Sequence, residues 1–293
     1  MTTIPPVNQE PADYLNAPNG DRIAYRWVRG TGPTVLWLGG FLSDMTGSKV
    51  MRLSEEAQAR GWDLLCFDYF AHGETGGDFG QASVGRWRDN VLAVVDGLTD
   101  GPVVAFGSSM GAHMLSLLIQ ARPGKVAAAG FLAPAADFVT ALMLPGLSPE
   151  DRRQLQVSGV YMMPGYDRDV PMSQAFFDDA ARHTVLGAPI AFEGPVRILH
   201  GMKDDVVPWR HGVRLMEALT SQDARMDLIK DGDHRLSRPQ DLDLLVATVA
   251  ELRDGVAASA LEDLQRYAHD HDQGEGSAVD DLIAQRRSEP ERH

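Results

Sequence analysis

Residues Gly107-Ser108-Ser109-Met110-Gly111 have the pattern G-x-S-x-G, which is the strongest indication of the fold in this sequence. An apolar run precedes it at residues 102–106, and a run compatible with a helix follows it at residues 112–119. This order predicts a strand, a sharp turn and a helix, with the central serine held on a strained turn at the carboxyl edge of a parallel sheet. Ser109 is therefore the candidate nucleophile, although the five residues alone also match an ordinary turn.

A serine nucleophile needs a base that accepts its proton and a third group that orients the base. Two later strand-like runs, residues 195–200 and 225–230, end in loops that carry these residue types. The first loop contains two neighbouring acids, Asp204 and Asp205, and the second contains His234. The chain order of serine, acid and histidine is the order that a strand–turn–helix serine predicts. We therefore assign His234 as the base and place the orienting acid in the first loop.

Other acids and histidines offer alternatives to this assignment. Asp137 suits an arrangement in which the acid follows an earlier strand, but it also suits a helix cap. His200 ends a strand and His113 lies in the helix after the turn. We expect both histidines to make structural hydrogen bonds rather than to act as the base.

Acyl transfer also requires two preset N–H donors for the oxyanion. Met110 directly follows the candidate nucleophile and supplies one backbone N–H. The strand-like run at residues 33–38 leads into a Gly-Gly turn, and we assign the N–H of the next residue, Phe41, as the second donor. In the alternative interpretation, the turn only faces solvent and Phe41 only packs.

The chain resembles the α/β-hydrolase superfamily over roughly residues 20 to 254. More closely, four segments are similar to the mitochondrial α/β-hydrolase-domain acyl-protein thioesterases: residues 40–49, 67–73, 84–89 and 107–111. The resemblance implies a mostly parallel, twisted sheet covered by helices on both faces. It also implies hydrolysis of acyl thioesters, esters or acyl glucuronides. Related hydrolases show the spacing G-x-x-D-x-x-V-P in the acid loop, which favours Asp204 over Asp205.

The chain departs from these relatives at three places. It has Ala71 where a glycine is usual, it shows no arginine-rich presequence, and it ends in a long polar segment. We interpret it as a bacterial-type relative of the group. In such hydrolases Asp68, His72 and Arg86 belong to loop structure, so we expect them to make buried hydrogen bonds rather than to act in catalysis.

Strand-like and helix-like runs alternate along one expected domain, residues 1–255, and a polar, flexible tail is expected over residues 256–293. A connection of about sixty residues precedes the acid-bearing strand, which predicts a helical cap over residues 136–190. Its apolar side chains suit an acyl chain or simple packing. The expected strands are residues 22–28, 33–38, 62–67, 102–107, 126–132, 195–200 and 225–230, and the expected helices include 47–60 and 86–98.

Two features of the expected tail allow other interpretations. Residues 269–277 alternate histidine and aspartate before a glycine-rich stretch, which favours a flexible connector over a metal site. Residues 278–287 have the pattern of a short amphipathic helix, although terminal disorder is the preferred interpretation. We therefore expect neither a metal nor a cofactor.

Composition limits the partners and the location. The 293 residues carry a formal charge of −14, so we expect no nucleic-acid partner, because phosphates would be repelled. The single cysteine, Cys66, excludes an internal disulfide. No run of eighteen apolar residues occurs, and the N-terminus has no secretory pattern, which predicts a cytoplasmic protein without stable membrane insertion.

The sequence thus predicts a metal-free serine hydrolase that cleaves esters or thioesters of small-molecule or acylated-protein substrates. Its predicted site comprises Ser109, Asp204 and His234, with Phe41 and Met110 as oxyanion donors. One alternative is a hydrolase of carbon–carbon bonds that uses the same three residues under a more polar cap. Another is a ligand receptor that retains these residues but turns over slowly.

Overall fold

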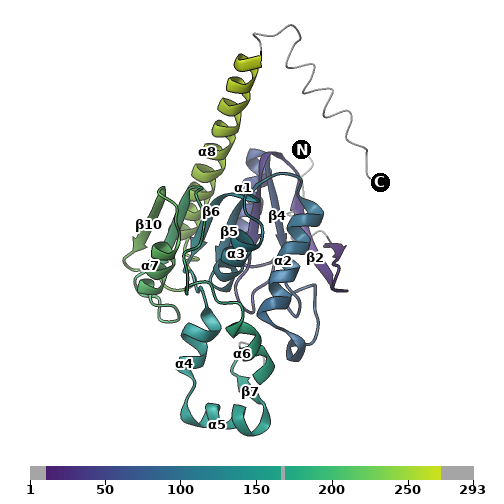
Figure 1. The fold of residues 1–293 in the computed structure, drawn as a ribbon, viewed down its shortest axis with the longest axis vertical. Helices are drawn as coiled ribbons and strands as arrows, with labels where there is room; N and C mark the ends of the chain where they lie inside the picture. Colours follow the sequence, from purple (N-terminus) through teal and green to yellow (C-terminus); the bar gives the residue numbers. More distant parts are fainter. Residues whose placement is uncertain (1–10, 166–168, 272–293) are drawn as a thin grey trace. The chain divides into compact units, whose positions relative to one another are not determined.

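The structure of the protein is a computed structural model that describes residues 11–165 and 169–271 (Figure 1). Its contacts divide the chain into two units, one ending at Arg253 and one beginning at Asp254. This division lies two residues before the boundary expected from the sequence. The site described below belongs entirely to the first unit.

The first unit is built on an eight-stranded sheet with the order β1-β2-β4-β3-β5-β6-β9-β10 (Figure 1). The strands β1 and β2 run antiparallel, and all strands from β4 to β10 in this order are parallel. The expected twisted, mostly parallel sheet is thereby confirmed. The bounds are β1 Asp13–Asn16, β2 Arg22–Val28, β3 Thr31–Leu38, β4 Trp62–Phe67, β5 Val103–Ser108, β6 Val126–Leu132, β9 Val196–Gly201 and β10 Ala224–Ile229.

Burial explains which strands the sequence predicts well. Every residue of β4 and β5 is buried, as expected for inner strands of a parallel sheet with helices on both faces. Their apolar runs are therefore visible in the sequence. The strand β1 is short, polar and almost fully exposed at the sheet edge, so no apolar pattern predicts it.

Helices cover both faces of this sheet. The helix α1 ends at Gly61, which adopts a left-handed conformation with φ 67° and whose N–H donates to the carbonyl of Ala57. The helix α2 begins after Ser83, whose hydroxyl accepts from the Arg86 N–H at 3.1 Å. The bounds are α1 Ser48–Arg60, α2 Val84–Leu98, α3 Met110–Ala121, α7 Trp209–Ala218 and α8 Pro239–His271, with a short 3₁₀ turn η2 at Phe79–Gln81.

The expected cap region contains helices and, in addition, a pair of strands that no sequence pattern predicted. Between β6 and β9, β7 and β8 form an antiparallel pair. Residues 160–163 read Val-Tyr-Met-Met and follow Gly159, which ends the preceding helix with φ 72°, so a β-branched and an aromatic residue start an extended segment. The elements are a π-helical turn η3 Phe138–Met143, α4 Leu144–Gly146, α5 Pro149–Ser158, β7 Val160–Met163, β8 Val170–Ser173 and α6 Gln174–Ala181.

The expected polar tail is described only in part. Its residues 256–271 continue the helix α8, so the predicted connector begins on a helix. The remainder of that connector, with most of the candidate metal-binding stretch, and the predicted helix at 278–287 lie outside the described residues.

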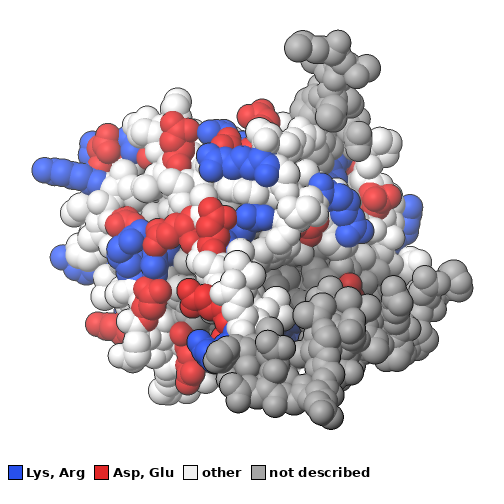
Figure 2. Space-filling model, turned by 90° about the horizontal axis from the view of Figure 1, so that it is seen from above, with Lys and Arg blue, Asp and Glu red and all other residues white. Residues whose placement is uncertain are grey.

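Within residues 11–165 and 169–271, no helix is long and apolar enough to cross a membrane. On the face seen in Figure 2, basic and acidic side chains are interspersed. Several basic groups pair with acids, as Arg197 does with Glu251 at 2.7 Å and Arg122 with Asp96 at 2.7 Å. The expected absence of a nucleic-acid partner stays a prediction.

Candidate active site

The candidate nucleophile sits on a strained turn between β5 and α3. Ser109 has φ 53° and ψ −114°, a conformation that is costly for a residue with a side chain. A Cβ at Gly107 would lie 2.4 Å from the carbonyl oxygen of Gly111, and a Cβ at Gly111 would lie 2.1 Å from that of Leu38. Both glycines are therefore required by close backbone approach, and they permit the turn that presents the Ser109 hydroxyl.

Three side chains from three strand ends meet in a hydrogen-bonded series. The Nε2 atom of His234, in the loop after β10, lies 3.1 Å from Ser109 Oγ. The Nδ1–H of the same ring donates to Oδ2 of Asp204, in the loop after β9, at 2.8 Å. Because the carboxylate binds the Nδ1 proton, Nε2 is left to accept the proton of the serine hydroxyl. The carboxyl ends of parallel strands bring these loops to one edge of the sheet.

Asp204 is fixed by more than its bond to His234. Its Oδ1 accepts the N–H groups of Val206 at 2.9 Å and Val207 at 2.7 Å, and its Oδ2 lies 3.2 Å from His200 Nε2. Burial opposes ionisation, but hydrogen bonds from His200, His234 and the Val207 backbone hold the pKa of Asp204 well below its usual range. Asp204 therefore remains an anion at neutral pH and can stabilise a positively charged His234 ring.

The alternative acids and histidines lie elsewhere. Asp205 is exposed, whereas Asp204 is 9% exposed and is the acid that contacts His234. His200 is fully buried and its Nε2 bonds the Val207 carbonyl at 2.9 Å, so it supports the acid loop. The sequence offered no sign that His200 would also reach Asp204.

A second histidine–aspartate pair forms where the chain enters the cap. The N–H of Asp137 donates to His113 Nδ1 at 2.9 Å. The Asp137 carboxylate accepts the N–H groups of Val185 at 2.7 Å and Leu186 at 3.0 Å, which lie at the other end of the cap. This pair joins the two ends of the cap and makes no contact with Ser109 in the described residues.

The two predicted oxyanion donors belong to backbone that borders Ser109. Met110 is the first residue of α3, so its N–H is one of the initial helix donors without an intrahelical acceptor. Phe41 follows Gly40, whose Cβ, if present, would lie 3.6 Å from Ser109 Cβ. The Phe41 ring itself packs against other aromatic rings, with centroid distances of 5.6 Å to Phe79 and 5.9 Å to Trp87. The donor roles of both N–H groups stay predictions.

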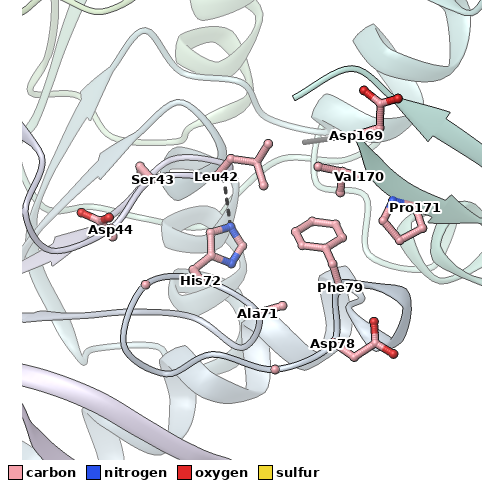
Figure 3. Close-up of a pocket in the computed structure, with 12 residues that line it drawn as sticks. Leu42, Ser43, Asp44, Ala71, His72, Asp78, Phe79, Asp169, Val170 and Pro171 are labelled. Carbon is pink, nitrogen blue, oxygen red and sulfur yellow. Dashed lines mark hydrogen bonds between the residues drawn. The ribbon is translucent and has the colours of Figure 1, made fainter. Parts of the chain in front are cut away.

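Two cavities flank the loop that follows β3. The Ser109 cavity has a volume of about 390 Å³ and is lined by Phe41, Ser109, His234 and Lys49, among others. The His72 cavity, of about 460 Å³, lies between this loop, the 71–79 segment and β8 (Figure 3). Residues 42–44 line both cavities, so one short loop separates them.

Lys49 is a residue of the Ser109 cavity that no sequence pattern singles out. Its ammonium group donates to the carbonyl of Arg235, the residue after His234. Burial lowers the pKa of Lys49 to about 8, although the negative charge of Asp233 raises it in part.

Asp68 and Arg86 make the structural hydrogen bonds expected of them. The Asp68 carboxylate accepts the N–H groups of Met45 at 2.9 Å and Glu74 at 2.8 Å, and burial raises its pKa to about 6. Arg86 Nε donates to Asp21 at 3.1 Å. Over the part of the chain that is described, no group of three or more His, Cys, Asp or Glu side chains has an arrangement that suits a metal ion.

Comparison with known proteins extends over most of the chain. It is 34% identical over 244 residues to the mitochondrial palmitoyl-protein thioesterase ABHD10 of Homo sapiens, which covers 82% of this chain and 79% of that protein. The Mus musculus protein of the same name is 34% identical over 247 residues, with 82% of each covered. No family model matches the chain.

Solved structures agree with these relationships. Alpha/beta hydrolase domain-containing protein 10 from mouse has a TM-score of 0.77 and 32% identity, covering 84% of this chain and 100% of that one. A putative hydrolase from Agrobacterium vitis S4 also has a TM-score of 0.77 and 32% identity, covering 83% and 100%. Est1E from Butyrivibrio proteoclasticus, at 19% identity and a TM-score of 0.66 over 85% and 100%, shares the fold. The chain therefore belongs to the α/β-hydrolases and, within them, to the ABHD10 family.

Proposed function

We propose that this enzyme hydrolyses acyl thioesters and carboxylic esters, with Ser109 as nucleophile, His234 as general base and Asp204 as the orienting acid. The observation that carries the proposal is the hydrogen-bonded series from Asp204 through His234 to Ser109, at 2.8 and 3.1 Å. Its serine stands on a turn that exposes the hydroxyl, and the series borders a cavity large enough for an acyl group.

The proposed reaction has two halves. In the first, His234 Nε2 accepts the Ser109 proton while Oγ attacks the carbonyl carbon, and the N–H groups of Phe41 and Met110 stabilise the oxyanion. The protonated His234 then donates its proton to the departing thiolate or alkoxide, which leaves an acyl-enzyme ester on Ser109. In the second half, His234 deprotonates a water molecule that attacks this ester, and Ser109 recovers its proton.

The proposed substrates are acylated proteins or small-molecule esters and thioesters. The names of the relatives, palmitoyl-protein thioesterases, support a long acyl chain on a thiol. Apolar side chains that line the Ser109 cavity offer surface for such a chain: Phe41, Leu42 and Val50. Metal and cofactor groups have no part in the proposed reaction.

Sustained hydrolysis of p-nitrophenyl esters from acetyl to palmitoyl, and of palmitoyl-cysteine thioesters, tests this function. The wild type and Ser109→Ala are compared over many turnovers per protein molecule. We expect continuous turnover in the wild type and a loss of at least about a thousandfold in the variant. A single burst without turnover would favour a receptor. Inertness toward all esters and thioesters, with cleavage of a vinylogous diketone, would favour the carbon–carbon hydrolase.

A further inference from the structure

The loop after β3 contains a residue in an unfavourable backbone conformation next to a predicted oxyanion donor. Leu42, which follows Phe41, has φ 56°. This left-handed conformation is costly for a branched residue and persists only where surrounding contacts impose it. The Leu42 N–H donates to His72 Nε2 at 3.1 Å, the bond drawn as a dashed line in Figure 3. A side chain from another segment thus holds the peptide unit that joins Phe41 to Leu42.

The orientation of the His72 ring is itself fixed. Its other nitrogen, Nδ1, lies 3.0 Å from the carbonyl oxygen of Phe70, which can only accept a proton. The same carbonyl accepts the indole N–H of Trp87 at 3.0 Å, and the Phe70 N–H donates to Asn90 Oδ1 at 2.8 Å. The proton of the neutral ring is therefore on Nδ1, and Nε2 carries the lone pair that accepts from Leu42.

The surroundings keep this ring neutral. His72 is 4% exposed, and its ring packs against Trp87 and Tyr69 with centroid distances of 5.4 and 5.8 Å. Burial lowers the pKa of His72, and the Phe70 carbonyl and the charge of Asp44 only partly oppose this effect. An imidazolium ring would have no acceptor for the Leu42 N–H, so the neutral form is the one that the loop requires.

We propose that His72 is a positioning residue for the reaction: by accepting the Leu42 N–H, it fixes the Phe41–Leu42 peptide and thereby restrains Phe41, whose own N–H lies in the adjoining Gly40–Phe41 peptide and is directed toward the oxyanion at Ser109. This inference rests on the proposed function and adds to it. His72 is 30 residues from Leu42 in sequence and does not contact the serine in the described residues. Its effect therefore passes through the loop that separates the two cavities.

Two substitutions separate the bond to Leu42 from the bond to Phe70. His72→Gln places an amide oxygen near the position of Nε2 and retains an acceptor for Leu42. His72→Asn retains a donor near Nδ1 but leaves the Leu42 N–H without an acceptor. We expect His72→Asn to lower kcat for p-nitrophenyl butyrate by about 10- to 100-fold with KM changed less than about threefold, because an oxyanion contact acts in the transition state. His72→Gln is expected to recover most of this loss.

The outcomes distinguish this inference from the proposed function. If Ser109→Ala still turns over, the proposed function fails. If Ser109→Ala is inactive but His72→Asn has the kcat of the wild type, or His72→Gln is as slow as His72→Asn, only the positioning role of His72 fails. A rise in KM at constant kcat would also overturn it.

A measurement on the wild type keeps the inference testable if a variant does not fold. Nitrogen NMR of histidine-labelled protein at neutral pH is expected to show His72 with the proton on Nδ1 and an unprotonated, hydrogen-bonded Nε2. A ring protonated on Nε2, or on both nitrogens, would contradict the proposal.

Discussion

Two histidine–aspartate pairs in this protein contain the same residue types but make opposite hydrogen bonds. At the sheet edge, the His234 ring donates to the Asp204 carboxylate at 2.8 Å and its far nitrogen lies 3.1 Å from Ser109 Oγ. Where the chain enters the cap, the ring of His113 accepts from the Asp137 backbone at 2.9 Å. In the first pair, both side chains belong to a series that ends at the Ser109 hydroxyl. In the second pair, both side chains accept hydrogen bonds from backbone N–H groups.

Exposure separates the two pairs further. The His234 side chain is 21% exposed and borders a cavity, whereas that of His113 is 2% exposed. Burial lowers the pKa of His113 to about 4, with Asp137 opposing it, so this ring stays neutral around pH 7. A histidine and an aspartate therefore suggest catalysis only when the ring donates to the carboxylate and directs a free lone pair at a nucleophile.

The largest expected effect comes from breaking the first pair. Asp204→Asn removes the anion that orients His234 and stabilises its charged form, so we expect kcat for p-nitrophenyl butyrate to fall by about 10³- to 10⁴-fold. The neighbouring, exposed Asp205 provides the matched control, since Asp205→Asn is expected to stay within about twofold of the wild type. Equal losses in the two variants would remove the distinction between the two acids.

The second pair is expected to affect the pH dependence of stability. Because the folded-state pKa of His113 lies at about 4, below the ordinary histidine value of 6.5, the unfolded chain binds this proton first as pH falls. Its contribution to stability is complete above pH 6.5 and is lost between pH 6.5 and 4, by up to about 3 kcal/mol.

His113→Asn tests this expectation, because it keeps an acceptor near Nδ1 and removes the titration. The free energy of unfolding in urea is measured for both proteins near pH 7 and pH 4.5. The variant is expected to lose less stability on acidification than the wild type. Parallel losses would mean that His113 is not a buried neutral ring.

The smallest expected effect comes from Asp137→Asn. The amide keeps one acceptor oxygen for the N–H groups of Val185 and Leu186, where the carboxylate provides two. We expect the free energy of unfolding to fall by about 1–2 kcal/mol and kcat to change less than about threefold. A loss of kcat as large as that of Asp204→Asn would give the second pair a part in the chemistry.

Some of these features could be predicted from the sequence, and others could not. The buried runs of β5 and β9, and the close-packed Gly107 and Gly111, leave patterns that are local in the chain, so the sheet and the strained turn at Ser109 were predictable. The order of residues after the strands then placed Asp204 and His234 at the same edge. The edge strand β1 and the β7–β8 pair were missed because each of these strands has only four residues, too few to show a clear periodicity.

Contacts between distant segments left no such pattern. The bond from Leu42 to His72 spans 30 residues and depends on the left-handed conformation of Leu42, which no sequence motif predicts. The two bonds from Asp137 to residues 185 and 186 span the whole cap. Such bonds follow from the folded backbone, so only the structure reveals them.

Covalent labelling can establish whether Ser109 is the nucleophile that His234 and Asp204 activate. The protein is treated with a fluorophosphonate, and the adduct is located by mass spectrometry of its peptides. We expect one adduct per chain, on Ser109, that is absent in Ser109→Ala and forms at least about a hundredfold more slowly in Asp204→Asn. An adduct on another residue, or equal labelling of Ser109→Ala and the wild type, would contradict it.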